Sequence, residues 1–389
     1  MSAPGEGTAA RATAAAPGAR EILVVAGEAS GDLHAAAVAR RIRELRPDLP
    51  IAGIGGDRMQ EAGVHLVMHS GQLAVMGLVE VIRHIPAHWR LLRSLERRMA
   101  AGGTALLVLV DYPGFNLRLA ERAARAGVPV LYYVTPQVWA WGAKRIPRIA
   151  RLVKRAAVIF EFEERLLRAN GVDATFVGHP LLDRARNLPS AREARETLGL
   201  APDGPVLALF PGSREQEIER HLDDFVATAH ELQRRIPGLQ VIVSVAPGIR
   251  LDPARCPYPT ATRASFPVLR AATAAMCKSG TTTLEAAVAG CPLVIGYRTS
   301  GWTYAVARRV VKIPHIGLVN IVAGREVARE FVQQALVPHD VANALQPLLT
   351  EGSAPRDAAL EGLAEVRAQL GEPGAADRVA AIALEMYQP

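Results

Sequence analysis

Short apolar runs rich in valine, isoleucine and leucine alternate along this chain with longer segments of helical periodicity. Such continuous runs are typical of strands that are buried on both faces, as in parallel sheets whose strands are joined by helices. The pattern therefore predicts an α/β protein built from parallel sheets covered by helices. The predicted strands are residues 22–26, 51–54, 105–110, 130–134, 158–160, 175–177, 206–210, 240–245, 274–277 and 292–296.

The predicted strands form two series, separated by a polar, proline-containing segment at residues 181–205. Since a domain has ~150 residues, a chain of 389 residues suggests two domains. Two Rossmann-like halves in succession predict a central cleft that the domains face. From Arg325 onward the sequence indicates amphipathic helices without strands. The expected parts are a disordered tail at residues 1–20, domains at 21–183 and 184–364, and C-terminal helices at 365–389 that pack back on the first domain.

The net charge of +7 and the pI near 9.6 indicate anionic partners: nucleic acid, a membrane surface or phosphorylated small molecules. The three cysteines include no C-x-x-C pair, so they support neither a disulfide framework nor a cysteine zinc site. They fit a reducing, cytoplasmic compartment. The longest apolar runs have the length of strands, so we expect no membrane-spanning helix.

The first predicted strand leads into residues 27–34, of sequence GEASGDLH. Because ligands of open α/β sheets bind beyond the carboxyl ends of the strands, Glu28 and His34 are candidates for a polar site. The alternative is a tight turn in which Ser30 or Asp32 caps the next helix. Residues 53–58, GIGGDR, lack the last glycine of the dinucleotide-binding motif, which favours a turn with a close backbone approach.

Asp111 stands at the carboxyl end of the very apolar run 105–110. A rigid strand can hold a general base in place there, which makes Asp111 the first catalytic candidate. Because Pro113 and Gly114 follow, initiation of a turn is an equally open alternative.

Two loops of the second series have the chemistry of phosphate binding. Residues 211–214, PGSR, end in the Arg214 guanidinium, whose planar fork suits phosphate oxygens; a surface ion pair with a nearby glutamate is the alternative. Residues 278–285, KSGTTTLE, open a helix whose free N–H groups and dipole attract a diphosphate. Glu285, one turn inside this helix, can accept hydrogen bonds from ribose hydroxyls or simply complement the dipole.

Residues 73–79 are strongly apolar and precede a segment rich in arginine. This order suits a phospholipid surface, whereas burial of the apolar part in the core is the alternative. Trp139 and Trp141 alternate with smaller residues, which predicts an extended segment with both indoles on one side. The residues expected to contact membrane or acyl chains are Val75, Met76, Leu78, Trp89, Arg90 and Arg93.

Seven motifs together resemble those of the lipid-A-disaccharide synthase family, in the same order, from about residue 21 to the end of the chain. They are residues 27–32, 73–80, 111–116, 136–141, 177–180, 211–214 and 279–285. The resemblance implies the GT-B architecture, in which the C-terminal domain holds UDP and the N-terminal domain holds the acceptor. It also implies an inverting glycosyltransferase that joins UDP-2,3-diacylglucosamine to 2,3-diacylglucosamine 1-phosphate (lipid X) and releases UDP and a β-1,6-linked disaccharide.

By the same resemblance Asp111 matches the proposed base, Arg214 and Asn320 match residues needed for activity, and Glu285 matches a position at the nucleotide. The implied catalytic residues are Asp111, Arg214, Asn320, Glu28 and His34. The implied donor-binding residues are Gly212, Ser213, Arg214, Ser279, Gly280, Thr281, Thr282 and Glu285. The chain departs from the family at Val319, where proline is frequent, and at Arg329, where proline also often precedes the glutamate.

The sequence contains no D-x-D, H-E-x-x-H or Walker pattern, so we expect neither a metal site nor a cofactor. The expected partners are the UDP-diacylglucosamine donor, the diacylglucosamine-phosphate acceptor and the cytoplasmic face of the inner membrane, to which the protein would bind peripherally. Self-association is compatible with the sequence. A UDP-sugar epimerase of similar fold is the alternative enzyme, whereas nucleic-acid binding is suggested by the net charge alone.

Overall fold

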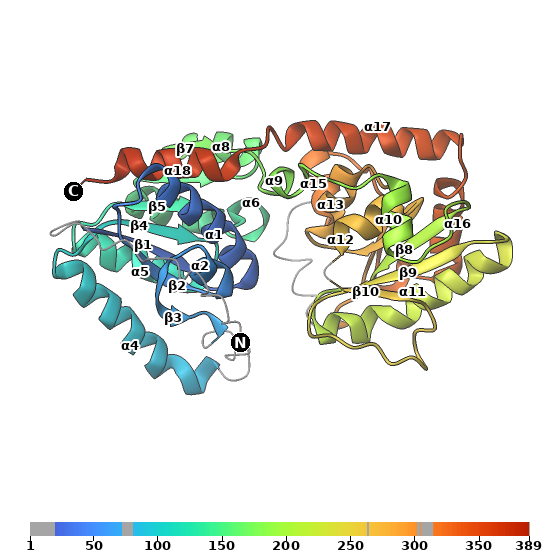
Figure 1. The fold of residues 1–389 in the computed structure, drawn as a ribbon, viewed down its shortest axis with the longest axis horizontal. Coiled ribbons are helices and arrows are strands. Elements are labelled where there is room, and N and C mark those ends of the chain that lie inside the picture. The colour runs from blue at the N-terminus through green and yellow to red at the C-terminus, as the bar shows by residue number, and fades with distance from the viewer. Residues whose placement is uncertain (1–19, 72–80, 263, 302–303, 305–313, 389) are drawn as a thin grey trace, which may run out of the picture. The chain divides into compact units, whose positions relative to one another are not determined.

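The computed structural model describes residues 20–71, 81–262, 264–301, 304 and 314–388. The chain divides into two compact units (Figure 1). Unit 1 comprises Met1–Val177 and Gly374–Pro389, and unit 2 comprises Gly178–Pro373. Each unit contains one parallel β-sheet with helices packed against it, which confirms the predicted α/β class.

The sheet of unit 1 has seven strands in the order β3-β2-β1-β4-β5-β6-β7. The strands are β1 (Glu21–Ala26), β2 (Ile51–Gly55), β3 (His65–His69), β4 (Thr104–Val110), β5 (Val130–Tyr133), β6 (Arg155–Val158) and β7 (Ala174–Phe176). The helices are α1 (Ala29–Leu45), α2 (Asp57–Glu61), α4 (Val81–Ala100), α5 (Pro113–Arg125), α6 (Val138–Trp141), the 3₁₀ turn η1 (Ala143–Arg145), α7 (Ile146–Leu152), α8 (Glu161–Arg168) and α18 (Ala375–Met386).

The central strands of unit 1 are buried on both faces. In β4, Leu107 and Leu109 pack with α4, α5 and α7, whereas Leu106 and Val108 pack with α1, α2 and α18. This two-sided burial explains the unbroken apolar run in the sequence. The last helix of the chain, α18, lies beside the first, α1 (Figure 1).

The sheet of unit 2 has six strands in the order β10-β9-β8-β11-β12-β13. The strands are β8 (Val206–Phe210), β9 (Gln240–Val245), β10 (Thr260–Thr262), β11 (Ala274–Lys278), β12 (Leu293–Tyr297) and β13 (Glu330–Val332). The helices are α9 (Leu181–Arg184), α10 (Ala191–Thr197), α11 (Glu215–Arg235), α12 (Ser265–Ala271), α13 (Thr282–Ala289), α15 (Leu318–Ala323), the 3₁₀ turn η2 (Gln333–Ala335), α16 (Pro338–Leu348) and α17 (Ala354–Gln369). α11 and α16 pack on one face of this sheet.

Three strands were not predicted from the sequence: β3, β10 and β13. Each lies at an edge of its sheet, where a strand is paired on one side and needs no continuous apolar run. β13 also shows that the prediction of helices alone after Arg325 is wrong. β6 begins three residues before the predicted 158–160 and ends at Val158. Phe160 is already the N-cap residue of α8.

The predicted extended segment around Trp139 is also wrong, since these residues form α6. The Trp139 indole N–H donates to Glu163 Oε1 at 2.9 Å. Burial raises the pKa of Glu163 to about 7. Trp139 therefore has a partner inside unit 1.

The unit boundaries differ from those expected. The chain passes between the units after Val177 and again after Pro373. α17 belongs to unit 2, where it packs against α13 and α15. Gly362 allows a close approach to Val327, since a Cβ there would lie 2.7 Å from Val327 Cγ1. α18 packs in the core of unit 1. Most of the expected N-terminal tail lies outside the described residues, but Arg20 is held to unit 1, since its guanidinium donates to the carbonyls of Gly102 and Thr104 at 2.9 and 2.7 Å.

The Asp32 side chain does not cap its own helix, α1, but binds the turn between β2 and α2. Its carboxylate accepts the backbone N–H groups of Gly56, Arg58 and Met59 at 2.6, 3.1 and 3.2 Å, which fixes the start of α2. At Gly53 a Cβ would lie 2.0 Å from the Val24 carbonyl oxygen. The close backbone approach therefore lies inside β2, beside β1, and not in a turn after the strand as predicted.

Candidate active site

The carboxyl ends of the strands of unit 1 bring three sequence candidates to one edge of the sheet. β1 and β4 are direct neighbours, with Ala26 opposite Val110, so Glu28 and Asp111 follow adjacent strands. His34, on α1, meets the ring of Tyr133 at the end of β5 edge-on, with 6.2 Å between the ring centroids. Glu28 is exposed and His34 is half-buried.

The backbone at Asp111 is held in an uncommon conformation. Both Asp111 and Tyr112 have a φ of 47°, in the left-handed region that costs non-glycine residues free energy. The Asp111 carbonyl accepts two hydrogen bonds, from Asn116 Nδ2 at 2.7 Å and from the Tyr132 hydroxyl at 2.8 Å. The Tyr112 ring lies against Gly27, where a Cβ would be only 2.4 Å from the ring. These contacts fix the main chain from which the Asp111 carboxyl group projects.

The same surroundings alter the acidity of Asp111. Burial raises the pKa of its carboxyl group above the ordinary value, the negative charge of Glu28 raises it further, and a hydrogen bond from the Tyr112 N–H opposes the rise. Asp111 therefore takes up a proton more readily than an ordinary aspartate.

In unit 2, residues 212–214 follow β8 and contact Glu217, one of the nearby glutamates that the sequence offered as an alternative partner for Arg214. Gly212 has a φ of 147°, and a Cβ there would lie 2.6 Å from Glu217 Cβ. Glu217 accepts the Ser213 N–H at 2.9 Å and pairs with Lys278 Nζ at 3.0 Å. Burial raises its pKa, but these two partners outweigh burial and hold the pKa below the ordinary value. An ion pair thus joins the first turn of α11 to the last residue of β11.

Arg214 is exposed at the N-cap of α11. Among the described residues no carboxylate oxygen lies within ion-pair distance of its guanidinium, so the alternative of a surface ion pair is not observed. Its charge nevertheless contributes to the low pKa of Glu217.

The loop after β11 leads into α13, with Thr281 exposed at the N-cap and Thr282 as the first helical residue. Glu285 is buried, and its Oε1 accepts a hydrogen bond from Arg184 Nη1 at 2.9 Å. The Arg184 guanidinium also lies over the Phe266 ring, 5.3 Å from its centroid. Glu285 is therefore held by a cation from α9, which the sequence did not indicate.

Ser279 and Asn320 already have partners inside unit 2. The Ser279 hydroxyl donates to the carbonyl of Ile316 at 2.7 Å. Asn320 is fully buried, and its amide bonds to residues 327–330 with both its oxygen and its nitrogen. Its side-chain amide has no polar atom left for a ligand, which does not favour the direct part in the reaction that the sequence predicted.

α4 carries the described part of the expected membrane contact. Trp89 is 48% exposed, and Arg90 and Arg93 are exposed. The Arg122 guanidinium lies over the Trp89 ring, 5.4 Å from the centroid, and pairs with Glu96. Val75, Met76 and Leu78 lie outside the described residues.

The described part of the chain contains no helix long and apolar enough to cross a bilayer. Within the same residues, no three His, Cys, Asp or Glu side chains are grouped as a metal ion would require.

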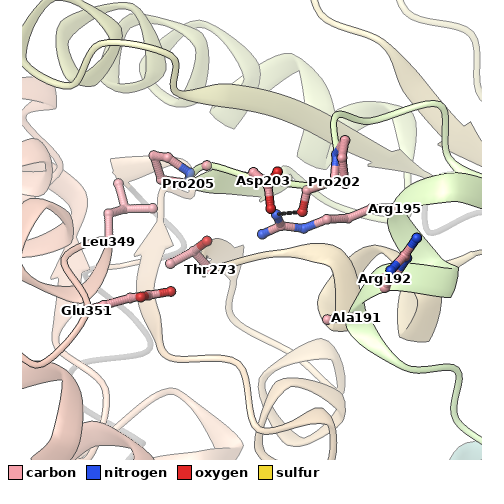
Figure 2. A pocket seen from close by; sticks show the side chains of 10 residues that line it. Ala191, Arg192, Arg195, Pro202, Asp203, Pro205, Thr273, Leu349 and Glu351 are labelled. Carbon is pink, nitrogen blue, oxygen red and sulfur yellow. Dashed lines mark hydrogen bonds between the residues drawn. The ribbon is translucent and has the colours of Figure 1, made fainter.

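A cavity of ≈ 790 Å³ lies at the other end of the sheet in unit 2 (Figure 2). Its lining includes Thr273 and Pro205, which precede β11 and β8, and Arg195, whose Nη1 donates to the Pro202 carbonyl at 2.6 Å. The candidate residues stand at the opposite, carboxyl ends of the same strands. This cavity is therefore separate from the candidate site.

A family model described as Lipid-A-disaccharide synthetase matches residues 22–383. The chain belongs to the lipid-A-disaccharide synthase family. The lipid-A-disaccharide synthase of Myxococcus xanthus is 43% identical over 95% of this chain and 98% of its own, and that of Geobacter metallireducens is 41% identical over 94% and 97%. As a member of this family the chain is a glycosyltransferase that transfers a hexosyl group.

Solved structures of low sequence identity share its fold. A putative UDP-N-acetylglucosamine 2-epimerase from Listeria monocytogenes has a TM-score of 0.62 at 13% identity and covers 93% of this chain and 95% of its own. The calicheamicin glycosyltransferase CalG4 has a TM-score of 0.62 at 17% identity, over 95% and 98%. The predicted GT-B fold of two Rossmann-like units is thus confirmed, and this fold by itself is shared by transferases and epimerases.

Several residues that hold the candidate site were not predicted from the sequence. Lys278 and Asn116 stand inside two of the motifs, residues 278–285 and 111–116. The neighbouring sequence does not indicate that they bond to Glu217 and to the Asp111 carbonyl. Tyr132 and Arg184 stand in a strand and a short helix far from their partners in the sequence. No sequence motif marks such a partner.

We expect Tyr132→Phe to lower turnover about twofold to tenfold. The change removes one of two hydrogen bonds that hold the Asp111 carbonyl, and such a bond contributes roughly 0.5–1.5 kcal/mol net. Steady-state kinetics should show the loss in kcat, because the substitution leaves the ring and its packing in place.

The matched control is Tyr387→Phe, which removes a hydroxyl that donates to another backbone carbonyl of unit 1, that of Arg20, at 2.7 Å. This variant should keep wild-type turnover. Equal losses in both variants, or none in Tyr132→Phe, would show that the hydroxyl does not act through Asp111.

Proposed function

We propose that the chain transfers a 2,3-diacylglucosamine group from UDP to the 6-hydroxyl of 2,3-diacylglucosamine 1-phosphate, with inversion at the anomeric carbon. The products are the β-1,6-linked lipid A disaccharide 1-phosphate and UDP. The match to lipid-A-disaccharide synthases over almost the whole chain is the observation that carries this proposal.

In this mechanism Asp111 is the general base. It accepts the proton of the acceptor 6-hydroxyl while that oxygen forms a bond to the donor anomeric carbon. The bond from that carbon to the diphosphate oxygen breaks, and its electron pair leaves with UDP. The raised pKa of Asp111 and the two hydrogen bonds to its carbonyl support this role, because they favour proton uptake by a group in a fixed place.

The donor belongs to unit 2 in this proposal. The exposed Arg214 and the free N–H groups at the start of α13, with Gly280, Thr281 and Thr282, would meet the charge that develops on the diphosphate. Gly212 and Ser213 shape the loop that carries Arg214. Glu285 would accept hydrogen bonds from the ribose.

The acceptor belongs to unit 1, at the strand edge that carries Glu28, His34 and Asp111. The acyl chains of both substrates require access to lipid. We assign this contact to the exposed part of α4, with Trp89, Arg90 and Arg93, together with the apolar residues Val75, Met76 and Leu78. The protein would bind peripherally to the cytoplasmic face of the inner membrane.

A UDP-sugar epimerase is the second candidate, because solved epimerases share the fold. The two functions differ in one requirement: an epimerase needs no second sugar.

The deciding assay is UDP release from UDP-2,3-diacylglucosamine in detergent micelles, with and without 2,3-diacylglucosamine 1-phosphate. We expect release only with the acceptor, and a disaccharide by mass spectrometry. Asp111→Asn should lower the rate by about 10²- to 10⁴-fold, as expected for loss of a general base. Acceptor-independent conversion of the donor would support the epimerase, and near-normal turnover of Asp111→Asn would remove Asp111 as the base.

The pH dependence of kcat/KM tests the coupling of Glu28 to Asp111. A base works deprotonated, so activity falls as the pH drops through its pKa. Glu28→Gln removes a negative charge that raises the pKa of Asp111 and should move the acidic limb of the profile to lower pH. Glu44→Gln, an exposed change on the same helix, should leave the limb in place. A limb that stays put or moves to higher pH in Glu28→Gln would contradict the coupling.

Membrane binding is tested by co-sedimentation with vesicles that contain anionic phospholipid. Each arginine near such a surface contributes about 1 kcal/mol, so the double variant Arg90→Gln/Arg93→Gln should bind about 30-fold more weakly. The control Arg40→Gln/Arg165→Gln removes two exposed arginines from α1 and α8 and should bind normally. Equal binding by both double variants would exclude this face of α4.

A further inference from the structure

One carboxylate in unit 2, Glu330 at the start of β13, holds the chain just before α15. Its Oε1 accepts the Gly317 N–H at 2.9 Å and Asn320 Nδ2 at 2.8 Å, and its Oε2 accepts the Ile316 N–H at 3.0 Å. Gly317 is the N-cap residue of α15. Glu330 therefore binds otherwise unsatisfied donors at the N-terminus of this helix, where a negative charge is also favoured.

Asn320, on α15, bonds to the chain that leads into β13. Its Oδ1 accepts the N–H groups of Val327 and Ala328 at 2.8 and 2.9 Å, and its Nδ2 also donates to the Ala328 carbonyl at 2.6 Å. With the bond to Glu330, both lone pairs and both N–H groups of the amide are in use. The buried Asn320 side chain thus links α15 to β13 and to the residues just before it.

The segment held by Glu330 is bonded in turn to the loop after β11. The Ile316 carbonyl accepts the Ser279 hydroxyl at 2.7 Å. The Val319 N–H donates to Thr283 Oγ1 at 3.3 Å, and that hydroxyl donates to the Gly280 carbonyl at 2.9 Å. The loop 279–283 is therefore fastened at two points to residues 316–319.

The main chain at Gly317 is also closely packed. A Cβ at Gly317 would lie 2.2 Å from Ile295 Cδ1 on β12 and 3.2 Å from Glu330 Oε1. The main chain at residue 317 is therefore close to both the Ile295 side chain and the Glu330 carboxylate. Loss of the carboxylate would leave the part-buried N–H groups of Ile316 and Gly317 without this partner in a tightly packed place.

We propose that Glu330 is a positioning residue for the donor nucleotide: together with Asn320 it fixes residues 316–319, and through Ser279 and Thr283 it holds loop 279–283 in its UDP-binding conformation. The inference rests on the proposed function of that loop. Glu330 touches no substrate in this role. It accounts for a need for Asn320 without any contact between that amide and a ligand.

One of these hydrogen bonds depends on a residue in which this chain departs from its family. Val319 stands where proline is frequent in the family, and proline has no N–H with which to bond Thr283 Oγ1. Proline fits the first turn of a helix, so Val319→Pro removes this bond while α15 can persist.

The test is the affinity for UDP, measured by calorimetry on the full chain, alongside kcat, the KM values of donor and acceptor, and Tm. We expect Glu330→Ala to weaken UDP binding and raise the donor KM by about tenfold or more, with the acceptor KM unchanged, because several charge-assisted hydrogen bonds are lost. Glu330→Gln should show an intermediate loss, since its amide oxygen can still accept from Gly317 and Asn320 while its NH₂ group faces the Ile316 N–H. Val319→Pro should weaken UDP binding about twofold to fivefold.

The matched control is Glu231→Ala, which removes another half-buried carboxylate of unit 2, one that pairs with Arg235 and His339. It should lower Tm and leave UDP affinity unchanged. A merely structural role of Glu330 would give this same result, so unchanged UDP affinity in folded Glu330→Ala overturns the proposal. If Glu330→Ala does not fold, unchanged affinity in Glu330→Gln and Val319→Pro overturns it.

The wild-type titration separates this inference from the proposed function. If the wild-type chain does not bind UDP, the assignment of loop 279–283 fails, and with it both proposals. If the wild type binds UDP and the variants bind it equally well, only the role of Glu330 fails.

Discussion

The strands at the centre of both sheets are paired on each side and packed against helices on each face, so their main-chain and side-chain atoms are unavailable to ligands. Polar chemistry is possible only where a strand ends. In unit 1 that edge carries Glu28 and Asp111, and in unit 2 it carries the loops after β8 and β11. The large cavity of unit 2 lies at the other edge, which shows that an open volume alone does not identify a site.

A strand end fixes where a loop starts, and buried hydrogen bonds then fix its conformation. At Asp111 a left-handed backbone is held by Asn116 and Tyr132, both of which bond to a carbonyl and leave the carboxyl group free to react. In unit 2, Asn320 and Glu330 hold the main chain beside the β11 loop in the same way. In both units the residues that hold the main chain are distinct from the proposed reacting groups. Loss of activity on substitution is therefore no proof that a residue touches substrate.

Carboxylates in a site for a diphosphate would repel the ligand if their charge were not compensated. Glu217 is paired with Lys278 and also accepts the Ser213 N–H, and Glu285 is paired with Arg184. These pairs leave Arg214 as an exposed cation near the start of α11. In the proposed mechanism Arg214 would therefore meet the diphosphate, while Glu217 and Glu285 keep partners of their own.

The sequence alone determined the α/β class, the central strands and the motifs at their ends, because two-sided burial leaves a continuous apolar run and strand order along the chain is local information. It did not reveal β3, β10 and β13, since edge strands need no such run. It placed Asp111, Arg214 and Glu285 after the strands where they are found. Only the tertiary structure showed that Tyr132, Arg184 and Glu330 bond to the segments of the candidate site. It also showed that all hydrogen bonds of the Asn320 amide are made within the protein. Such pairings join residues that are distant in the chain. They are decided by side-chain packing, which leaves no periodic pattern in the sequence.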